Sequence, residues 1–378
     1  MQTDSVVFIN LSYASSLSAA LRRRHSREMI LVPMPEPRAK LPPKNGAPVR
    51  PIPAQRTPVR TKDTQAIFAS FEKEMGLPLL AYWTSSGGSI CQNDVMAMAQ
   101  LLDTRKHGSA VGLFLKSDGG NPEAALRLVH LLRSKFKRVV LYAPFECASA
   151  ATMVALGANE IHMGPTSYLT AVDTSLKHQL SPVDSRNEIV SVSQDEVSRI
   201  LRLWKEQHVK GNPYPEVYRY LHPLVIGALD RSSSLSIRIC QELLSYHMPT
   251  GRRAAQISQK LNSTYPSHSY PITAREARKL GLNVRDLGVR EASLLRELNA
   301  LYSHMANPIL TDYDQENHHN HEICNILEIR DRQIYYQVDK DWHYRKEERR
   351  WIATNDKSGW QRVTHQNSKW VTETFYIR

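Results

Sequence analysis

The sequence predicts an α/β fold, and the clearest evidence lies between residues 111 and 164. Residues 111–116 are a short apolar run typical of a buried strand, and residues 138–144 are a second one. Between them, residues 123–132 carry apolar side chains at helical spacing. A helix of small residues follows over 149–157. Consecutive parallel units of this kind bring the loops after their strands to one edge of the sheet, where ligands usually bind.

Two of these loops carry groups suited to acyl transfer. Gly119 and Gly120 follow the first strand, and glycine allows a sharp turn that points backbone N–H groups outward. Such donors can stabilise an oxyanion, each contributing about 3–4 kcal/mol in enzymes. Ser149 opens the small-residue helix and lies in the positive field of its N-terminus. Each feature alone is typical of an ordinary turn or a packed helix, but their order favours a catalytic site.

Five segments of the chain resemble the serine dehydrogenase proteinase family. They are SDGGNPEAA (117–125), ECASAATM (146–153), ALGANEI (155–161), MGPTSYLTAVDTSL (163–176) and YPITAREARKLGL (270–282). The resemblance covers roughly residues 65–300 and implies a Clp/crotonase-type ββα superhelix, related to the SppA signal-peptide peptidases and ClpP. It implies Ser149 as nucleophile, Gly119 and Gly120 as oxyanion hole, and a homo-oligomer.

The general base is left open by the sequence. A serine hydroxyl needs a neighbouring base, and the resemblance places Val172 or Asp173 where ClpP-like proteases carry a histidine. His178 is preferred over Lys177, because histidine titrates near neutrality whereas lysine needs burial to lower its pKa. Asp173 is expected to orient a histidine. The alternative is that 177–179 is a solvated loop, and His268 is expected to be an ordinary loop histidine.

Composition divides the chain into three parts. Residues 1–62 are basic and rich in proline, which predicts a disordered segment that supplies much of the net charge of +12 and is able to contact an acidic partner. Residues 63–304 form the proteinase-like domain. Its region 193–260 is predicted to be a helical insertion that begins with a capping box at Ser193. The resemblance to Clp/crotonase folds implies that this insertion acts as a lid or subunit contact. Residues 305–378 are predicted to be a small β-rich extension.

The four cysteines are scattered, which suits a reduced cytoplasmic interior. Cys147, close to the serine, is expected to be a buried packing residue. The sequence contains no run of 18 consecutive apolar residues, so no transmembrane helix is predicted. No cofactor or metal is expected, because the histidines of 317–321 lack the spacing of a recognised zinc motif.

The favoured function is that of a serine peptidase acting on peptides or unfolded protein. Two alternatives use the same fold. The first is a crotonase-type enzyme that stabilises a thioester enolate in the same oxyanion hole, although the sequence contains no recognisable acyl-CoA site. The second is a non-catalytic oligomeric scaffold, suggested by the missing histidine at the ClpP position.

Overall fold

The computed structural model describes residues 61–103, 108–173, 175–185, 188–208, 210–248 and 251–377. These residues belong to one compact unit. The basic, proline-rich segment predicted over 1–62 lies almost wholly outside the described residues, so its disorder and its partner stay predictions.

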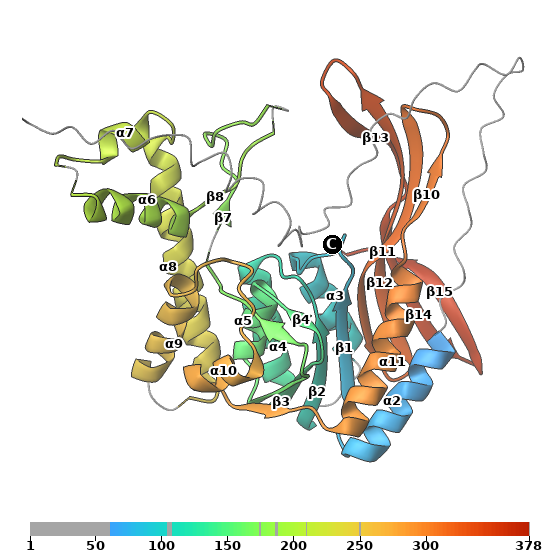
Figure 1. The fold of residues 1–378 in the computed structure, drawn as a ribbon. Helices are drawn as coiled ribbons and strands as arrows, with labels where there is room; N and C mark the ends of the chain where they lie inside the picture. Colours follow the sequence, from blue (N-terminus) through green and yellow to red (C-terminus); the bar gives the residue numbers. More distant parts are fainter. Residues whose placement is uncertain are drawn as a thin grey trace, which may run out of the picture. The chain divides into compact units, whose positions relative to one another are not determined.

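The described part of the chain is built around a large mixed sheet (Figure 1). Along its main path the strand order is β15-β14-β12-β11-β1-β2-β3-β5-β9, with β10 paired to β11 and β13 to β12. The strands are β1 (Leu79–Thr84), β2 (Gly108–Lys116), β3 (Phe136–Ala143), β5 (Glu160–Met163), β9 (Val284–Asp286), β10 (Ile309–Asp312), β11 (Asn317–Ile329), β12 (Arg332–Arg345), β13 (Arg350–Asp356), β14 (Gly359–Gln366) and β15 (Lys369–Phe375). From β1 to β9 the pairings are parallel, and from β1 to β15 they are antiparallel. The mixed α/β architecture expected from the sequence is confirmed.

Helices cover both faces of the parallel part of the sheet (Figure 1). The helices of the described residues are α2 (Thr61–Met75), α3 (Gln92–Leu102), α4 (Pro122–Lys135), α5 (Ala150–Leu156), α6 (Gln194–Glu206), α7 (Tyr214–Tyr218), α8 (Pro223–Ser245), α9 (Gly251–Ser263), α10 (Ala274–Leu280) and α11 (Val289–Ala306). Of these, α6 and α7 lie away from the sheet and pack with the first part of α8 in a separate apolar cluster (Figure 1). Alternate residues of a strand face opposite sides of a sheet. In β1, Leu80 and Tyr82 therefore pack with α3, α4 and α5, whereas Leu79 and Ala81 pack with α2 and α11.

Several local predictions are confirmed. The strands at 111–116 and 138–144 and the helix at 123–132 correspond to β2, β3 and α4. The region 193–260 is helical, and the Ser193 hydroxyl accepts from the Glu196 N–H, as in a capping box. Gly281 ends α10 with φ of 95°, a left-handed conformation that glycine adopts without strain.

The C-terminal strands continue the central sheet, because β11 pairs antiparallel with β1. The pairing runs from Ala81 opposite Glu328 to Thr84 opposite Asn325. The Glu328 carboxylate is fully buried there. It accepts hydrogen bonds from Thr64 and Gln65 of α2, Tyr302 of α11 and Gln333 of β12. A buried carboxylate needs such partners, so this residue holds four elements together.

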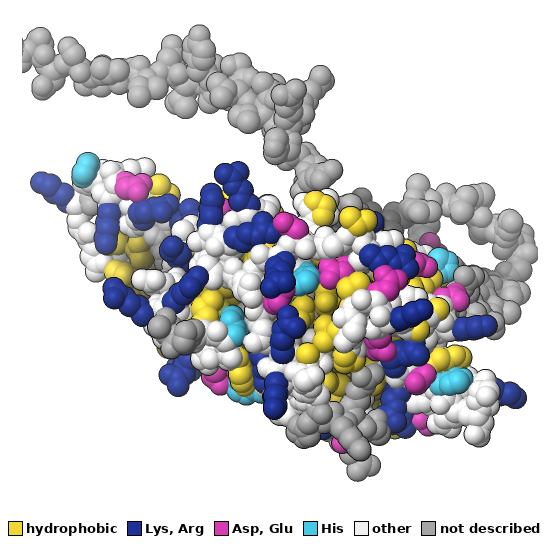
Figure 2. Space-filling model, turned by 90° about the horizontal axis from the view of Figure 1, so that it is seen from below, with side chains coloured by type: hydrophobic (Ala, Val, Ile, Leu, Met, Phe, Trp, Pro, Cys, Tyr) yellow, Lys and Arg dark blue, Asp and Glu magenta, His cyan; other side chains and the backbone are white. Residues whose placement is uncertain are grey.

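Charged side chains are dispersed on the face of the molecule seen in Figure 2. Lys and Arg occur at many separate places, with Asp and Glu among them. This face therefore presents no continuous basic surface. Within the described ranges, no helix combines the length and apolar character needed to cross a membrane.

Candidate active site

Ser149 has a strained backbone at the junction of a short strand and a helix. It follows β4 (Glu146–Cys147) and is the N-cap of α5, with φ of 51° and ψ of −119°. A positive φ is uncommon outside glycine and is often found where function requires a particular side-chain direction. A strained serine between strand and helix is also the arrangement that exposes the nucleophile in hydrolases.

The backbone of Ser149 is held by two threonines. Its N–H donates to Thr170 Oγ1 (2.8 Å), which lies just after β6 (Tyr168–Leu169). The Thr170 N–H donates to Thr152 Oγ1 (3.0 Å), and the Thr152 hydroxyl donates to the Cys147 carbonyl (2.8 Å). The bonds of Thr152 to Thr170 and to Cys147 are buried and the bond from Ser149 is partly buried, and together they connect both sides of the turn. They stabilise the strained backbone conformation of Ser149.

Gly119 packs directly against the serine. A Cβ at Gly119 would lie 2.6 Å from Ser149 Cβ, 2.9 Å from the Ala148 carbonyl oxygen and 3.1 Å from the Ala150 nitrogen. Its φ is 111°. Only glycine fits at this contact, because any side chain would overlap the serine and its neighbours. Gly119 is buried, although the sequence predicted a turn whose backbone N–H groups point outward.

The two glycine N–H groups are used differently. The Gly119 N–H donates to the Ser117 hydroxyl (3.1 Å) and is thereby already engaged. Gly120 is exposed, with φ of 146°, and its N–H makes no hydrogen bond to any of the described residues. Ala150 supplies a further donor that sequence reasoning missed, because the first N–H of a helix has no acceptor within it. The Gly120 and Ala150 N–H groups are thus the unbonded donors, among the described residues, of the two turns that meet at the contact between Gly119 and Ser149.

The structure pairs Asp173 with His268 instead of the preferred histidine. His268 Nδ1 lies 2.7 Å from Asp173 Oδ1, and the side chains are 47% and 12% exposed. The hydrogen bond to Asp173 raises the pKa of His268, against the opposing effect of partial burial. No local signal links these residues, because they are 95 positions apart.

The other two base candidates lie near the start of a loop after β7 (Ser175–Leu176). His178 is half-buried, and its Nδ1 accepts from the Leu180 N–H (3.1 Å) within its own turn. Lys177 is exposed. Within the described ranges, Ser149 Oγ makes no hydrogen bond, so none of the candidate bases is hydrogen-bonded to it in this structure.

Two other groups near the serine are accounted for by the structure. Burial raises the pKa of the Cys147 thiol well above its usual range, and the thiol is fully buried. It is therefore a packing residue, as expected, because the thiolate is the nucleophilic form. Lys116 at the end of β2 pairs with Glu146 (2.8 Å) and donates to the Thr84 carbonyl (3.0 Å). This ion pair links β2 to the strand that leads into Ser149.

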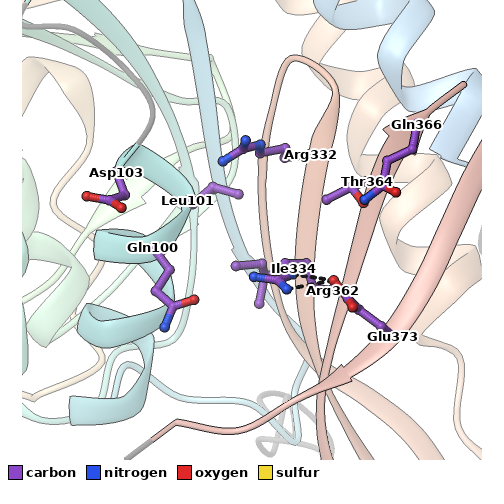
Figure 3. A pocket seen from close by; sticks show the side chains of 9 residues that line it. All are labelled: Gln100, Leu101, Asp103, Arg332, Ile334, Arg362, Thr364, Gln366 and Glu373. Atoms are coloured by element: carbon purple, nitrogen blue, oxygen red, sulfur yellow. Dashed lines mark hydrogen bonds and ion pairs between the residues drawn. The ribbon is translucent and has the colours of Figure 1, made fainter.

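A cavity of about 550 Å³ lies elsewhere, between α3 and strands β12, β14 and β15 (Figure 3). Its lining includes Asp103, Arg332 and the ion pair of Arg362 with Glu373 (2.6 Å). None of the predicted catalytic residues lines it. The cavity is thus separate from the candidate active site.

The histidines of 317–321 have neighbours that explain them. His318 packs edge-on against Trp351 (4.3 Å between ring centroids), and His319 Nδ1 lies 3.0 Å from Asp341. In the part of the chain that the structure describes, no group of three or more His, Cys, Asp and Glu side chains is arranged to hold a metal ion.

Comparison with known proteins finds likeness only among solved structures. No protein-family model and no curated protein matches the sequence. Two solved structures are variants of the 1510-N membrane-bound stomatin-specific protease. One is a lysine-to-alanine mutant in complex with a substrate peptide, which is 17% identical to this chain. The match covers 57% of this chain and 78% of the mutant's chain, with a TM-score of 0.35. The other is a serine-to-alanine mutant, also 17% identical. The match covers 62% of this chain and 87% of the mutant's chain, with a TM-score of 0.33.

A third solved structure is an asparagine-to-aspartate mutant of ClpP1 from Listeria monocytogenes. It has 14% identity, covers 59% of this chain and 98% of its own, and has a TM-score of 0.31. At TM-scores this low, the argument for a site depends on the geometry of this chain alone.

Replacing Gly119 by alanine is expected to disrupt the site. The new Cβ would overlap Ser149 and the Ala148 carbonyl, and a positive φ costs a non-glycine residue about 1–3 kcal/mol. Urea unfolding should show a loss of at least about 2 kcal/mol. Gly211→Ala is the matched control for φ, since Gly211 also has a positive φ but nothing lies within 4 Å of its added Cβ. Equal losses for both variants would show that the contact with Ser149 is unimportant.

Proposed function

We propose that the chain is a serine peptidase of the Clp/crotonase type with Ser149 as nucleophile. The observation that carries the proposal is the strained Ser149 backbone, held by Thr170 and packed against a glycine that no other residue can replace. Its substrates are peptides or unfolded proteins. The proposal stands on this geometry together with the sequence resemblance.

The proposed reaction uses two N–H groups and one imidazole. Ser149 Oγ attacks the peptide carbonyl carbon while His268 Nε2 takes the hydroxyl proton, and the carbonyl electron pair moves to oxygen. The N–H groups of Gly120 and Ala150 stabilise that oxyanion, a contribution of about 3–4 kcal/mol per donor. The C–N bond then breaks as the imidazolium returns the proton to the leaving amine. Water, deprotonated by the same imidazole, then attacks the acyl carbonyl carbon. The ester C–O bond to Ser149 Oγ breaks, and the imidazolium returns the proton to Oγ as the carboxylic acid product leaves.

His268 is proposed as base because a carboxylate orients it. Asp173 accepts from Nδ1, which leaves Nε2 unprotonated in the neutral ring and able to accept a proton. His178 uses its Nδ1 within its own turn, and the Lys177 side chain is exposed. Both remain alternatives that the pH experiment below separates from His268.

Covalent labelling tests the nucleophile. A fluorophosphonate is expected to modify Ser149 alone, detected by mass-spectrometric mapping of the intact chain. Ser149→Ala should abolish labelling, whereas Ser134→Ala, at an exposed helix position, should leave it unchanged. A folded chain that takes up no label would contradict the peptidase and favour the non-catalytic scaffold.

The labelling rate should depend on pH through His268. A base acts when deprotonated, and the bond to Asp173 raises the pKa of His268, so the rate should increase with pH with a midpoint above about 6.5. Asp173→Asn should move that midpoint down. His268→Gln should slow labelling about 100-fold, while His178→Gln and Lys177→Met change it less than about twofold. A large loss in either of the last two variants would instead assign the base to that residue.

The helical region is proposed to mediate homo-oligomerisation. Large apolar side chains are exposed on α6 and α8 and between them, including Ile200 (51%), Leu203 (50%), Tyr220 (81%) and Leu224 (62%). Exposed apolar groups gathered in this way mark interaction surfaces.

Light scattering should therefore give a mass that is a multiple of the 43.1 kDa chain. The double variant Ile200→Glu, Leu203→Glu should lower the mass, because it places charges in the contact. Val289→Glu, at an 89% exposed position on α11, is the control and should leave the mass unchanged. A wild-type monomer at micromolar concentration would exclude the assembly.

A further inference from the structure

A polar cavity of about 200 Å³ lies between α6, α8 and α9, beside Asp173. The residues that line it are all polar or charged: Asp173, Gln194, Asp195, Ser198, Arg199, Arg202, Ser233, Asn262 and Ser263. Arg199 pairs with Asp195 and Arg202 with Glu206. The charges on the α6 wall are therefore largely neutralised, and the uncharged amide and hydroxyl groups determine what the cavity can bind.

Two buried amide atoms in this lining lack partners among the described residues. The Asn262 side chain is only 8% exposed, and its Oδ1 accepts from the Ser233 hydroxyl (2.9 Å) while its Nδ2 makes no hydrogen bond. Gln194 Oε1 is likewise buried without a partner. Leaving a buried polar group unsatisfied costs about 1–3 kcal/mol. Such a pair is therefore best explained by a ligand that supplies both bonds.

The unpaired atoms are one donor and one acceptor. Asn262 Nδ2 requires an acceptor such as a carbonyl oxygen, and Gln194 Oε1 requires an N–H donor. A peptide group carries both on adjacent atoms. No apolar residue is among those that line the cavity, so the main chain of a polypeptide matches this lining better than a hydrophobic side chain does.

The cavity lies close to the serine along the chain. The Thr170 hydroxyl accepts a hydrogen bond from the Ser149 N–H. Thr170 is three residues before Asp173, so the Cα atoms of Thr170 and Asp173 are within about 11 Å of each other. The Val172 N–H donates to the Leu261 carbonyl, which joins this segment to α9 (3.0 Å). Arg199 Nη2 also donates to the Tyr265 carbonyl (3.3 Å), in the loop that carries His268. These contacts join the segment that holds Ser149 and the loop that carries His268 to the helices that line the cavity.

We infer that this cavity is a subsite that binds the peptide backbone of the substrate, with Asn262 and Gln194 as its positioning residues. The inference rests on the proposed peptidase function and adds to it the place where the substrate main chain is held. Its recognition is independent of substrate side chains, which suits unfolded polypeptides of varied sequence.

Binding to the full chain carrying Ser149→Ala tests the subsite. The probe is fluorescein-labelled, reduced and carboxymethylated α-lactalbumin, an unfolded polypeptide, followed by fluorescence anisotropy. In this Ser149→Ala background, Asn262→Asp keeps an acceptor for the Ser233 hydroxyl but removes the Nδ2 donor. It should weaken binding of the probe about five- to tenfold. Added Gln194→Met, which removes the acceptor without introducing charge, should weaken it about three- to fivefold.

Gln256→Glu is the matched control, because it makes the same amide-to-carboxylate change on an exposed position of α9 outside this cavity. It should leave affinity unchanged, and thermal melting should show that all variants fold. Unchanged affinity in both cavity variants, or no binding of the probe to Ser149→Ala, would overturn the subsite and leave water as the occupant.

The two proposals fail separately, because Ser149 is replaced in the binding assay. Fluorophosphonate labelling of wild-type Ser149 together with unchanged affinity in the cavity variants would retain the peptidase and reject the subsite. Weakened binding in those variants without any labelling would retain polypeptide binding at the cavity and reject the peptidase.

Discussion

The contact between Gly119 and Ser149 is the constraint that shapes the candidate site. The turn after β2 and the turn before α5 approach so closely that a single added carbon would overlap Ser149 and the Ala148 carbonyl. Close packing of this kind leaves no freedom for the serine backbone, which adopts φ of 51° in consequence of the fold and not of its own preference. The same approach brings the turn that carries the Gly120 N–H against the turn that carries Ser149 and the Ala150 N–H.

Strain at Ser149 persists because buried hydrogen bonds on both sides oppose its relaxation. Thr170 and Thr152 connect the serine to β6 and to the end of β4, and the Lys116–Glu146 pair fixes that strand to β2. Relaxing the serine would require one of these bonds to break, and the Thr152 and Thr170 side chains are buried, where a lost hydrogen bond is costly. This is the usual way in which a fold maintains an unfavourable backbone at a functional position.

The helices α6, α8 and α9 contribute polar groups as well as an apolar surface. Their outward side chains include Ile200, Leu203 and Leu224, while their inner faces line the cavity at Asp173 with amides and hydroxyls. One set of helices can thereby serve assembly on the outside and substrate contact on the inside. Both roles depend on the amphipathic spacing of α6, which a helical period imposes.

Local sequence patterns account for the secondary structure of this protein, whereas packing between distant segments sets the contacts of its candidate site. Apolar periodicity predicts β2, α4 and β3, the Ser193 capping box predicts the start of α6, and glycines predict the turns at 119–120 and 281. Each depends on residues within a few positions of one another, because helical and strand periods are local properties. The resemblance to a known family adds the expected roles of Ser149 and the Gly-Gly turn.

Packing between distant segments joins β11 to β1 and places Gln194 and Asn262 around one cavity. It also pairs Asp173 with His268, where sequence reasoning favoured His178. It also engages the Gly119 N–H with Ser117 and leaves the Gly120 N–H unbonded among the described residues. These contacts arise from how strands and helices pack over tens to hundreds of residues, and no local pattern encodes them.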